Sequence, residues 1–395
     1  MKVLQINSVC GYGSTGRIAV DLYHTLERNG HDCIIAYGRE NAPEGIKTIK
    51  IGNKLDFYWQ VFLTRIFDKH GYGSKRATKK LIQQIEQYDP DIIHLHNIHG
   101  YYINFKILFE YLANCHKPII WTLHDCWSFT GHCAHFDYAD CKKWKEHCRK
   151  CPQKKSYPHS IFLDNSKKNY DQKRKLFNQI ENLTFVTPSE WLAKLLKESF
   201  LSKHNVKVIN NGIDLSIFKP TPSNLRKQYQ LENKKIILGV ASKWKKRKGL
   251  DTFIQLAGKL DDSYQIILIG ISQEDKKKLP SNVLAIARTN DVTELAQFYT
   301  IADVFVNPTL EDNFPTTNIE ALACGTPVIT YNTGGSPEAI NEKCGIIVEK
   351  QNINKLLNTI TQFDKKKYID CINQAKKFEK LNQYNQYIEL YKEVK

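Results

Sequence analysis

The sequence predicts an α/β protein made of two successive doubly wound units, each with a parallel sheet covered by helices on both faces. Three observations predict this class. The chain has 395 residues, which is long for a single hydrophobic core and suits two domains of ordinary size. Short apolar strands alternate with amphipathic helices, as in sheets buried on both sides. That alternation breaks at a proline-containing stretch and starts again near Lys235.

The composition is that of a globular protein, with 42% apolar and 25% charged residues, which excludes disorder over the whole chain. Lysine and arginine total 57 against 41 acidic residues, and the net charge of +16 favours anionic partners such as nucleotides, nucleic acid or an acidic membrane surface. No stretch approaches the roughly 20 apolar residues of a membrane helix, and no signal-peptide pattern opens the chain. The odd count of 11 cysteines argues against a disulfide scaffold. We therefore expect a cytoplasmic protein.

The first half begins with a strand at Val3–Ser8, a glycine loop at Gly11–Gly16 and a helix at Arg17–Asn29. Apolar residues recur on one face of that helix, and Gly30 ends it. The other strands expected in this half are Cys33–Tyr37, Ile92–Leu95, Ile119–Leu123, Leu183–Val186 and Val206–Asn210.

The second half follows a junction near Asn211–Asp214, which two prolines follow closely. Its expected strands are Lys235–Val240, Gln265–Ile269, Val283–Ala287, Val304–Asn307 and Pro327–Thr330. From about Gln351 the composition is helical. The expected organisation is one domain at 1–214 with a cysteine-rich insert at about 126–158, a second domain at 215–375, and a helix at 376–395 that packs back on the first domain.

Loops that follow the strands are the expected binding sites, because ligands of open parallel sheets bind beyond the carboxyl ends of the strands. Two such sheets facing each other would place these loops around a cleft. The loop Gly11–Gly16 follows the first strand and precedes a helix. Its glycines, Gly13 and Gly16 among them, let backbone N–H groups approach a phosphate at the helix N-terminus. The alternative is a tight turn with no ligand.

The basic stretch Lys243–Gly249 occupies the matching place in the second half, between a strand and a helix. A cluster of cations at a helix N-terminus opposes the helix dipole, and an anionic ligand would remove that conflict. The alternative is a solvated basic loop. Because the stretch directly follows a strand, phosphate binding is the favoured interpretation.

The segment Pro308–Ile329 runs from a strand end through an acidic turn into a short helix that Gly325 ends. Asp312 lies at its mouth, and Glu320 follows eight residues later, about two helical turns on. Two carboxylates on one side of a cleft can accept hydrogen bonds from sugar and ribose hydroxyls. The alternative is an acid near a helix N-terminus and an unrelated surface acid.

This segment resembles the acid-x7-acid motif of glycosyltransferase family 4, whose members are retaining enzymes with the GT-B fold of two Rossmann-like domains. Other pieces occur in the family's order: the glycine loop, His124-Asp125 after a strand, Asn211–Asp214, Lys248-Gly249 and Gly334–Glu338. The stretch Cys10–Arg17 and the cysteine-rich insert are similar to a subgroup that builds bacterial exopolysaccharides, capsules and lipopolysaccharide. The resemblance covers nearly the whole chain.

The resemblance implies a role for each matching residue. Glu320 would bind ribose, Asp312 or its neighbour Glu311 the transferred sugar, and Lys248 the diphosphate. The family has Glu at the first acid and an Arg before the Lys; here Asp312 stands at the first place, and Ser242 or Lys243 at the second. His124 would contact the sugar near the reacting carbon. The implied catalytic residues are His124, Lys248, Asp312 and Glu320, and the implied donor-binding residues are Gly13, Gly16, Lys243, Lys248, Thr289, Glu311, Asp312, Asn313, Phe314 and Glu320.

The resemblance also implies the reaction: transfer of a hexose from a UDP- or GDP-sugar to a glycan or lipid-linked acceptor, with retention and without a catalytic metal. The N-terminal domain would be the acceptor side, where Asn97, His99 and Asp125 follow strands. The second domain would bind the nucleotide sugar. A basic, aromatic stretch at Lys142–Lys155 could rest on anionic lipid at the inner face of the cytoplasmic membrane; its alternative is a solvated loop.

Four cysteines in the insert, Cys133, Cys141, Cys148 and Cys151, could form a structural zinc site, since the last pair has the spacing of a zinc knuckle. The alternative is a set of reduced free cysteines. His94 and His96 share one face of a strand and are expected to be hydrogen-bonded histidines rather than a metal pair.

Two other functions remain open at this point. A sugar-nucleotide 2-epimerase would share the two-domain architecture but would need no acceptor. A nucleic-acid-binding protein would explain the charge, although the basic runs are scattered and no recognition motif appears.

Overall fold

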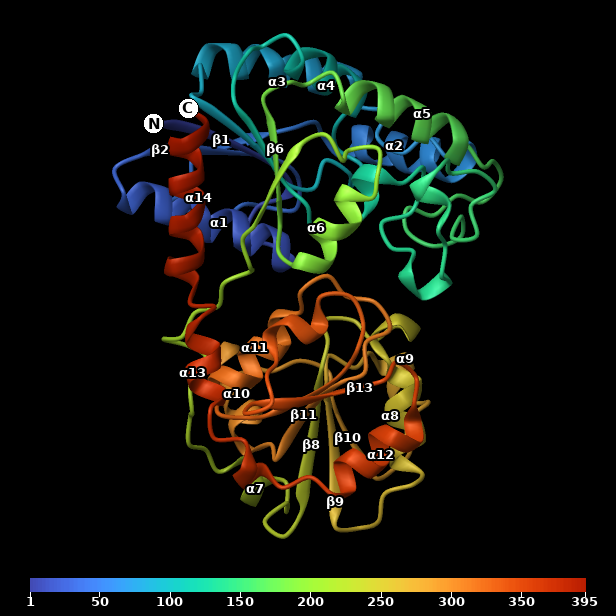
Figure 1. Cartoon of the computed structure of the whole chain (residues 1–395), viewed down its shortest axis with the longest axis vertical. Coiled ribbons are helices and arrows are strands. Elements are labelled where there is room, and N and C mark those ends of the chain that lie inside the picture. The colour runs from blue at the N-terminus through green and yellow to red at the C-terminus, as the bar shows by residue number, and fades with distance from the viewer. The chain divides into compact units, whose positions relative to one another are not determined.

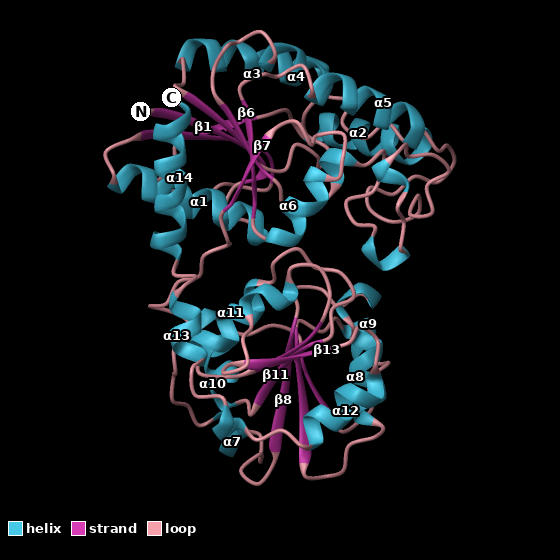
Figure 2. Ribbon diagram, viewed as in Figure 1, coloured by secondary structure: helices cyan, strands magenta, loops and turns pink.

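The computed structural model describes residues 1–395 and divides them into two compact units (Figures 1 and 2). The first unit comprises Met1–Asn210 together with Tyr384–Lys395, and the second comprises Asn211–Gln383. Both are α/β units with a parallel sheet, so the predicted fold class is confirmed.

The first unit contains a seven-stranded parallel sheet with strand order β3-β2-β1-β4-β5-β6-β7. Its strands are β1 (Lys2–Val9), β2 (Asp32–Arg39), β3 (Thr48–Lys50), β4 (Ile92–Leu95), β5 (Ile119–Thr122), β6 (Leu183–Thr187) and β7 (Asn205–Val208). Six were predicted to within one or two residues at each end. The edge strand β3 was missed because it has only three residues and is largely exposed, which leaves no apolar pattern to detect.

Helices cover the sheet of the first unit. They are α1 (Gly13–Arg28), α2 (Lys54–Phe67), α3 (Lys75–Tyr88), α4 (Phe105–Leu112), α5 (Ser166–Phe177), α6 (Glu190–Lys197) and α14 (Lys380–Val394), with short 3-10 turns at η1 (Trp127–Phe129), η2 (Asp137–Ala139) and η3 (Lys143–Lys145). Helix α1 begins at Gly13, four residues before the predicted start. The glycine loop is therefore shorter than expected, and its second half is the first turn of the helix.

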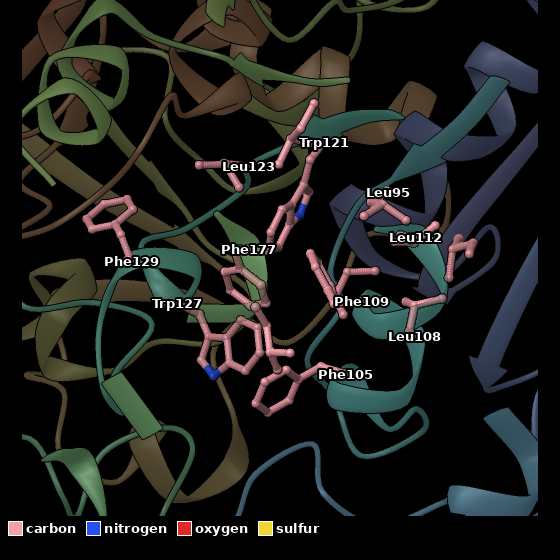
Figure 3. Close-up of a cluster of buried hydrophobic side chains, with 14 of the residues drawn as sticks. Leu95, Phe105, Leu108, Phe109, Leu112, Trp121, Leu123, Trp127, Phe129 and Phe177 are labelled. Carbon is pink, nitrogen blue, oxygen red and sulfur yellow. The ribbon is translucent and has the colours of Figure 1, made fainter. Parts of the chain in front are cut away.

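An aromatic cluster fills the core between β5 and the helices α4 and α5 (Figure 3). The rings of Phe109 and Phe177 have centroids 4.2 Å apart, and Trp121 meets Phe177 edge-on at 5.0 Å. Trp127, from the turn after β5, is also buried in this cluster. The core therefore fixes the end of β5, from which His124 and Asp125 follow.

Helix α14 is built from the end of the chain but belongs to the first unit from Tyr384 onward. Figure 1 shows it in red beside the blue elements of that unit. Tyr387 and Tyr391 are buried, and their hydroxyls reach Thr122 on β5 (3.1 Å) and His94 on β4 (2.6 Å). The helix thus joins two strands that come far earlier in the sequence.

The second unit contains a six-stranded parallel sheet with order β10-β9-β8-β11-β12-β13. Its strands are β8 (Lys235–Val240), β9 (Tyr264–Ile269), β10 (Val283–Ile286), β11 (Val304–Asn307), β12 (Val328–Tyr331) and β13 (Gly345–Val348). Its helices are α7 (Leu225–Gln228), α8 (Leu250–Ala257), α9 (Gln273–Lys276), α10 (Val292–Ile301), α11 (Thr316–Ala323), α12 (Ile353–Thr361) and α13 (Cys371–Lys376), with 3-10 turns at η4 (Lys246–Lys248), η5 (Ser336–Ala339) and η6 (Lys365–Lys367). Strand β13 was not predicted, although its sequence Gly-Ile-Ile-Val is apolar.

Each sheet reverses its strand order at one point, between β1 and β4 in the first unit and between β8 and β11 in the second. Loops that leave the carboxyl ends of such neighbouring strands diverge and leave room for a ligand. No helix in the structure is both long and apolar enough to cross a bilayer.

Candidate functional site

The glycine loop after β1 is closed by a hydrogen bond from the backbone N–H of Gly11 to the carbonyl of Gly16 (3.0 Å). A Cβ atom at Gly16 would lie 3.0 Å from the Gly11 nitrogen and 3.1 Å from a methyl group of Val9. The loop therefore needs glycine here in order to turn tightly. As a result, the N-terminus of α1, which no side chain caps, lies directly at the end of β1.

Three residues predicted for the acceptor side, together with His124, which was predicted to contact the transferred sugar, line one cavity in the first unit. They are Asn97, His99, His124 and Asp125, from the loops after β4 and β5. His99 Nε2 lies 2.8 Å from Asp125 Oδ2, and His99 Nδ1 lies 3.0 Å from the hydroxyl of Tyr157. Burial alone would raise the pKa of Asp125, but His99 holds that pKa well below its usual range. Asp125 is therefore a carboxylate at neutral pH.

His124 ends a chain of buried hydrogen bonds. Gln5 Nε2 donates to the carbonyl of Ala19 (3.0 Å), which orients the Gln5 amide so that its oxygen faces His96 Nε2 (2.9 Å). His96 Nδ1 in turn lies 3.2 Å from His124 Nε2, and the two rings stack with centroids 5.5 Å apart. Desolvation lowers the pKa of His124 to about 4 and that of His96 well below 6.5, so both rings are neutral at pH 7.

The direction of this chain follows from the fixed amide of Gln5. Its oxygen accepts a hydrogen bond from Nε2–H of His96, so Nδ1 of His96 carries a lone pair and no proton. That lone pair accepts a hydrogen bond from Nε2–H of His124. The remaining nitrogen of His124, Nδ1, therefore carries no proton. His94 and His96 are both hydrogen-bonded, so the prediction of satisfied histidines is confirmed.

The acidic turn of the second unit lies against the basic loop. Lys248, at the end of η4, forms an ion pair with Asp312, in the loop after β11. Arg247 donates to the carbonyl of Glu311 (2.6 Å). Because β8 and β11 are neighbours at the reversal of strand order, these two loops meet at the switch point of the sheet.

Gly334 holds the acidic turn from its other side. A Cβ atom at Gly334 would lie 1.9 Å from the carbonyl oxygen of Asp312, and the residue has φ +57°. The N–H of Gly335 donates to that same carbonyl (3.2 Å). The stretch Gly334–Glu338 that the sequence singled out therefore packs directly on the turn that carries Asp312.

Glu320 lies on α11, where its carboxylate accepts a hydrogen bond from the buried hydroxyl of Tyr299 on α10 (3.0 Å). The same helix is anchored by Asn318, which accepts from Asn307 (2.7 Å) and donates to the carbonyl of Ser336 (3.0 Å). Glu320 is half-buried, and the hydrogen bond from Tyr299 orients its carboxylate.

The structure brings only some of the predicted donor residues together. Lys248, Glu311, Asp312, Asn313 and Phe314 form one connected turn, in which Glu311 and Phe314 are buried. Lys243 is exposed, and Thr289 is half-buried in the loop after β10, two strands away from β8. Sequence reasoning did not single out Tyr299, Gln5 or Tyr157, because each is distant in sequence from the residue it orients.

The four cysteines of the insert line one common cavity, together with His132. All are free thiols. As they stand, no three His, Cys, Asp or Glu side chains are arranged to hold a metal ion.

Comparison with known proteins places this geometry in a family. The family model described as Glycosyltransferase Family 4 matches residues 15–217, and that of Glycosyl transferases group 1 matches residues 223–380. A protein of Escherichia coli (strain K12), provisionally named as the colanic acid biosynthesis glycosyl transferase WcaC, is 26% identical over 90% of this chain and 89% of its own length.

Solved structures share the fold. Sucrose-phosphate synthase from Thermosynechococcus elongatus matches with a TM-score of 0.75 at 18% identity, covering 100% of this chain and 99% of that one. Anabaena HepE, solved in complex with UDP, matches with a TM-score of 0.69 at 16% identity over 100% of both chains. The predicted GT-B fold is therefore confirmed.

Proposed function

The chain belongs to glycosyltransferase family 4, and we propose that it transfers a hexose from a nucleoside diphosphate sugar to a glycan or lipid-linked acceptor, with retention of anomeric configuration. The observation that carries this proposal is the ion pair of Lys248 and Asp312 at the switch point of the second sheet. Asp312 lies eight residues before Glu320 in the sequence. This arrangement puts a cation for a diphosphate and carboxylates for sugar hydroxyls on neighbouring loops.

The ion pair supports a specific order of events on donor binding. A diphosphate carries more negative charge than Asp312 and accepts hydrogen bonds from a lysine in the same way. It would therefore displace Asp312 as the partner of Lys248. The carboxylate released from the ion pair could then accept hydrogen bonds from the transferred sugar, while Glu320, held by Tyr299, binds the ribose.

The proposed chemistry is a front-side displacement. The bond from the anomeric carbon to the diphosphate oxygen breaks, and negative charge that builds on that oxygen is stabilised by Lys248 and by helix N-termini. The acceptor hydroxyl attacks from the same face, and its proton passes to the leaving phosphate. These protein cations take the role of a catalytic metal. UDP or GDP is the proposed nucleotide; the neighbour solved with UDP supports the first.

The first unit supplies the proposed acceptor side. The unprotonated Nδ1 of His124 can accept a hydrogen bond from a sugar hydroxyl, and the Asp125 carboxylate lines the same cavity. Asn97 and His99 line that cavity and are the proposed contacts to the acceptor. The provisional name of the Escherichia coli relative supports a role in cell-surface polysaccharide assembly.

A surface of the first unit supports contact with the membrane, where a lipid-linked acceptor would lie. Helix α2 exposes a row of large apolar side chains, Leu55, Tyr58, Trp59 and Phe62, and Ile161–Leu163 lies beside its end through a hydrogen bond from Ile161 N–H to the Arg65 carbonyl (2.8 Å). Exposed Lys54, Arg65 and Lys69 lie on the same helix or next to it. Aromatic and basic side chains together suit an anionic bilayer surface, and we propose peripheral binding there at the inner face of the cytoplasmic membrane.

The test is a transfer assay with radiolabelled UDP- and GDP-hexoses and a lipid acceptor fraction. The expected result is radiolabel in the lipid extract only when the acceptor is present. The anomeric configuration of the transferred sugar, measured by NMR, should be the same in the product as in the donor. Sugar conversion without any acceptor would instead identify an epimerase. A product of inverted configuration would contradict the retaining mechanism.

A further inference from the structure

The cysteine-rich insert is long and nearly free of regular structure. Between η1 and α5, residues 130–165 contain only the two short turns η2 and η3. Loops of this length inside a compact unit are uncommon unless something specific orders them. Phe136 and Trp144 supply a small aromatic core, with ring centroids 4.9 Å apart. That core is too small to order the whole segment alone, so the insert needs a second organising element.

The second element is a cavity lined by the four thiols. Cys133, Cys141, Cys148 and Cys151 come from separate turns of the insert, yet they line the same cavity. Cys133 and Cys151 are hydrogen-bonded to each other, and Cys148 lies close enough to interact electrostatically with Cys141 and Cys151. Since no three of these groups form a closed shell as they stand, a metal would have to draw them inward by side-chain rotation.

Backbone N–H groups already point at two of these sulfurs. The N–H of Gln153 is hydrogen-bonded to Cys151, two residues before it, and the N–H of Gly131 is hydrogen-bonded to Cys148. Gly131 can approach so closely because a Cβ atom there would lie 2.7 Å from the Cys148 Cβ. Such backbone contacts hold the two side chains in place and can persist when the sulfurs bind a metal.

An independent feature of the cavity points to a missing occupant. His132 lines it, its side chain is fully buried, and its Nε2 atom has no hydrogen-bond partner. Its other nitrogen, Nδ1, lies 2.5 Å from Asp68, whose side chain is 1% exposed. Buried ring nitrogens in native proteins almost always have a partner. An unpartnered nitrogen in the wall of this cavity indicates an occupant other than protein atoms, such as a water molecule ordered beside an ion held by the thiols.

We propose that Cys133, Cys141, Cys148 and Cys151 bind one structural Zn²⁺ ion as thiolates in tetrahedral coordination. Four soft sulfur ligands select zinc among the common divalent ions. The thiol protons are displaced by the metal and pass to solvent. The ion ties the turns of the insert together and so holds Tyr157, whose hydroxyl contacts His99 in the acceptor-side cavity.

The test is native mass spectrometry of the full-length protein, with metal analysis of the same sample. The expected result is one zinc per chain in the native mass and none after denaturation. The Cys148→Ser/Cys151→Ser variant is expected to lose the zinc. Its matched control is Cys115→Ser, a thiol outside the cavity, which should retain it.

If the Cys148→Ser/Cys151→Ser variant does not fold, the metal content of the unaltered protein still decides the test. Replacement of zinc by Co²⁺ should give the visible absorption of tetrahedral cobalt and the ultraviolet bands of cobalt–thiolate bonds. Protein purified from zinc-supplemented medium without bound metal would overturn the proposal. A native mass two hydrogens lower, with no zinc, would overturn it in favour of a disulfide. Neither outcome bears on nucleotide-sugar binding in the second unit.

Discussion

The ion pair of Lys248 and Asp312 joins two residues 64 positions apart in the sequence. Both side chains are largely shielded, with 26% and 16% exposed, yet neither is fully buried. A fully buried pair would serve only the fold, and a fully exposed one would contribute little. A half-shielded pair at a switch point can exchange partners when an anion arrives.

Replacing this cation tests the exchange. For Lys248→Ala we expect kcat to fall by about 10²–10³-fold, because an electrostatic contact to the leaving diphosphate is lost. Steady-state kinetics on the donor measure this. The control is Lys245→Ala, which removes an exposed lysine from the same loop and should leave kcat unchanged. Equal losses in both variants would mean that the loop acts through its general charge.

The proton positions on His96 and His124 give a second prediction at this scale. The fixed amide of Gln5 requires both rings to be neutral with the proton on Nε2. Long-range ¹H–¹⁵N correlation spectra of protein labelled at histidine report which ring nitrogen is protonated. A proton on Nδ1 of His124 at pH 7 would contradict the hydrogen-bond chain and remove the proposed acceptor for a sugar hydroxyl.

The sequence singled out the loops of the candidate site but not which side chains within them meet. Asn97, His99, His124 and Asp125 were predicted from their places after strands, and they line one cavity. The links from Gln5 to His96 and from Tyr299 to Glu320 were not predicted. Each is set by strand order and helix packing, which residue spacing does not encode.

At the scale of elements, the aromatic row on α2 was not singled out in the sequence, because spacing alone does not show whether an apolar helix face is covered. The structure exposes Tyr58 and Trp59 by 65% and 54%, and Phe62 by 46%. The sequence had offered the basic stretch Lys142–Lys155 as a lipid-contacting surface, with a solvated loop as its alternative. The difference arises because burial of a helix face depends on whether another element covers it.

Binding to lipid vesicles distinguishes these surfaces. We expect Trp59→Ser/Phe62→Ser to weaken binding to vesicles of anionic phospholipid at least tenfold, since two aromatic side chains no longer enter the interface. Co-sedimentation at several lipid concentrations measures it. The control Lys142→Ser/Lys143→Ser alters the insert and should weaken binding less. The reverse ranking, with the insert variant more strongly affected, would contradict the assignment to α2.

Of the thirteen strands only β3 and β13 were missed, whereas long helices such as α2 and α3 were not predicted. The strands β3 and β13 are edge strands of three and four residues. Helix α1 begins inside the predicted glycine loop, since φ +64° at Gly13 lets the chain turn directly into the helix. Periodicity carries no information at such short or glycine-rich sites.

At the scale of the whole molecule, buried neutral histidines make stability depend on pH. Desolvation lowers the pKa of His94 to about 3 and that of His124 to about 4, below 6.5 in the unfolded chain. Between pH 6.5 and about 4 the unfolded chain therefore binds more protons than the native one, so the free energy of unfolding falls as pH falls. Fully buried His94 contributes about 2 kcal/mol of that loss between pH 6.5 and about pH 5.

Urea unfolding at pH 7.5 and at about pH 5 measures this loss. The variant His204→Gln removes another histidine of lowered pKa and should reduce the difference between the two pH values. The control His116→Ala removes an exposed histidine and should not change the difference. A free energy of unfolding that is equal at both pH values would show that these rings are accessible to water.

The claim that the second unit binds a nucleoside diphosphate sugar is tested most directly by thermal unfolding with UDP, GDP, ADP and CMP, one at a time. A ligand that binds only the folded protein raises its unfolding temperature. We predict a selective rise with UDP or GDP that is strongly reduced in Lys248→Ala and retained in Lys245→Ala. No rise with any nucleotide at saturating concentration would contradict the proposed donor site.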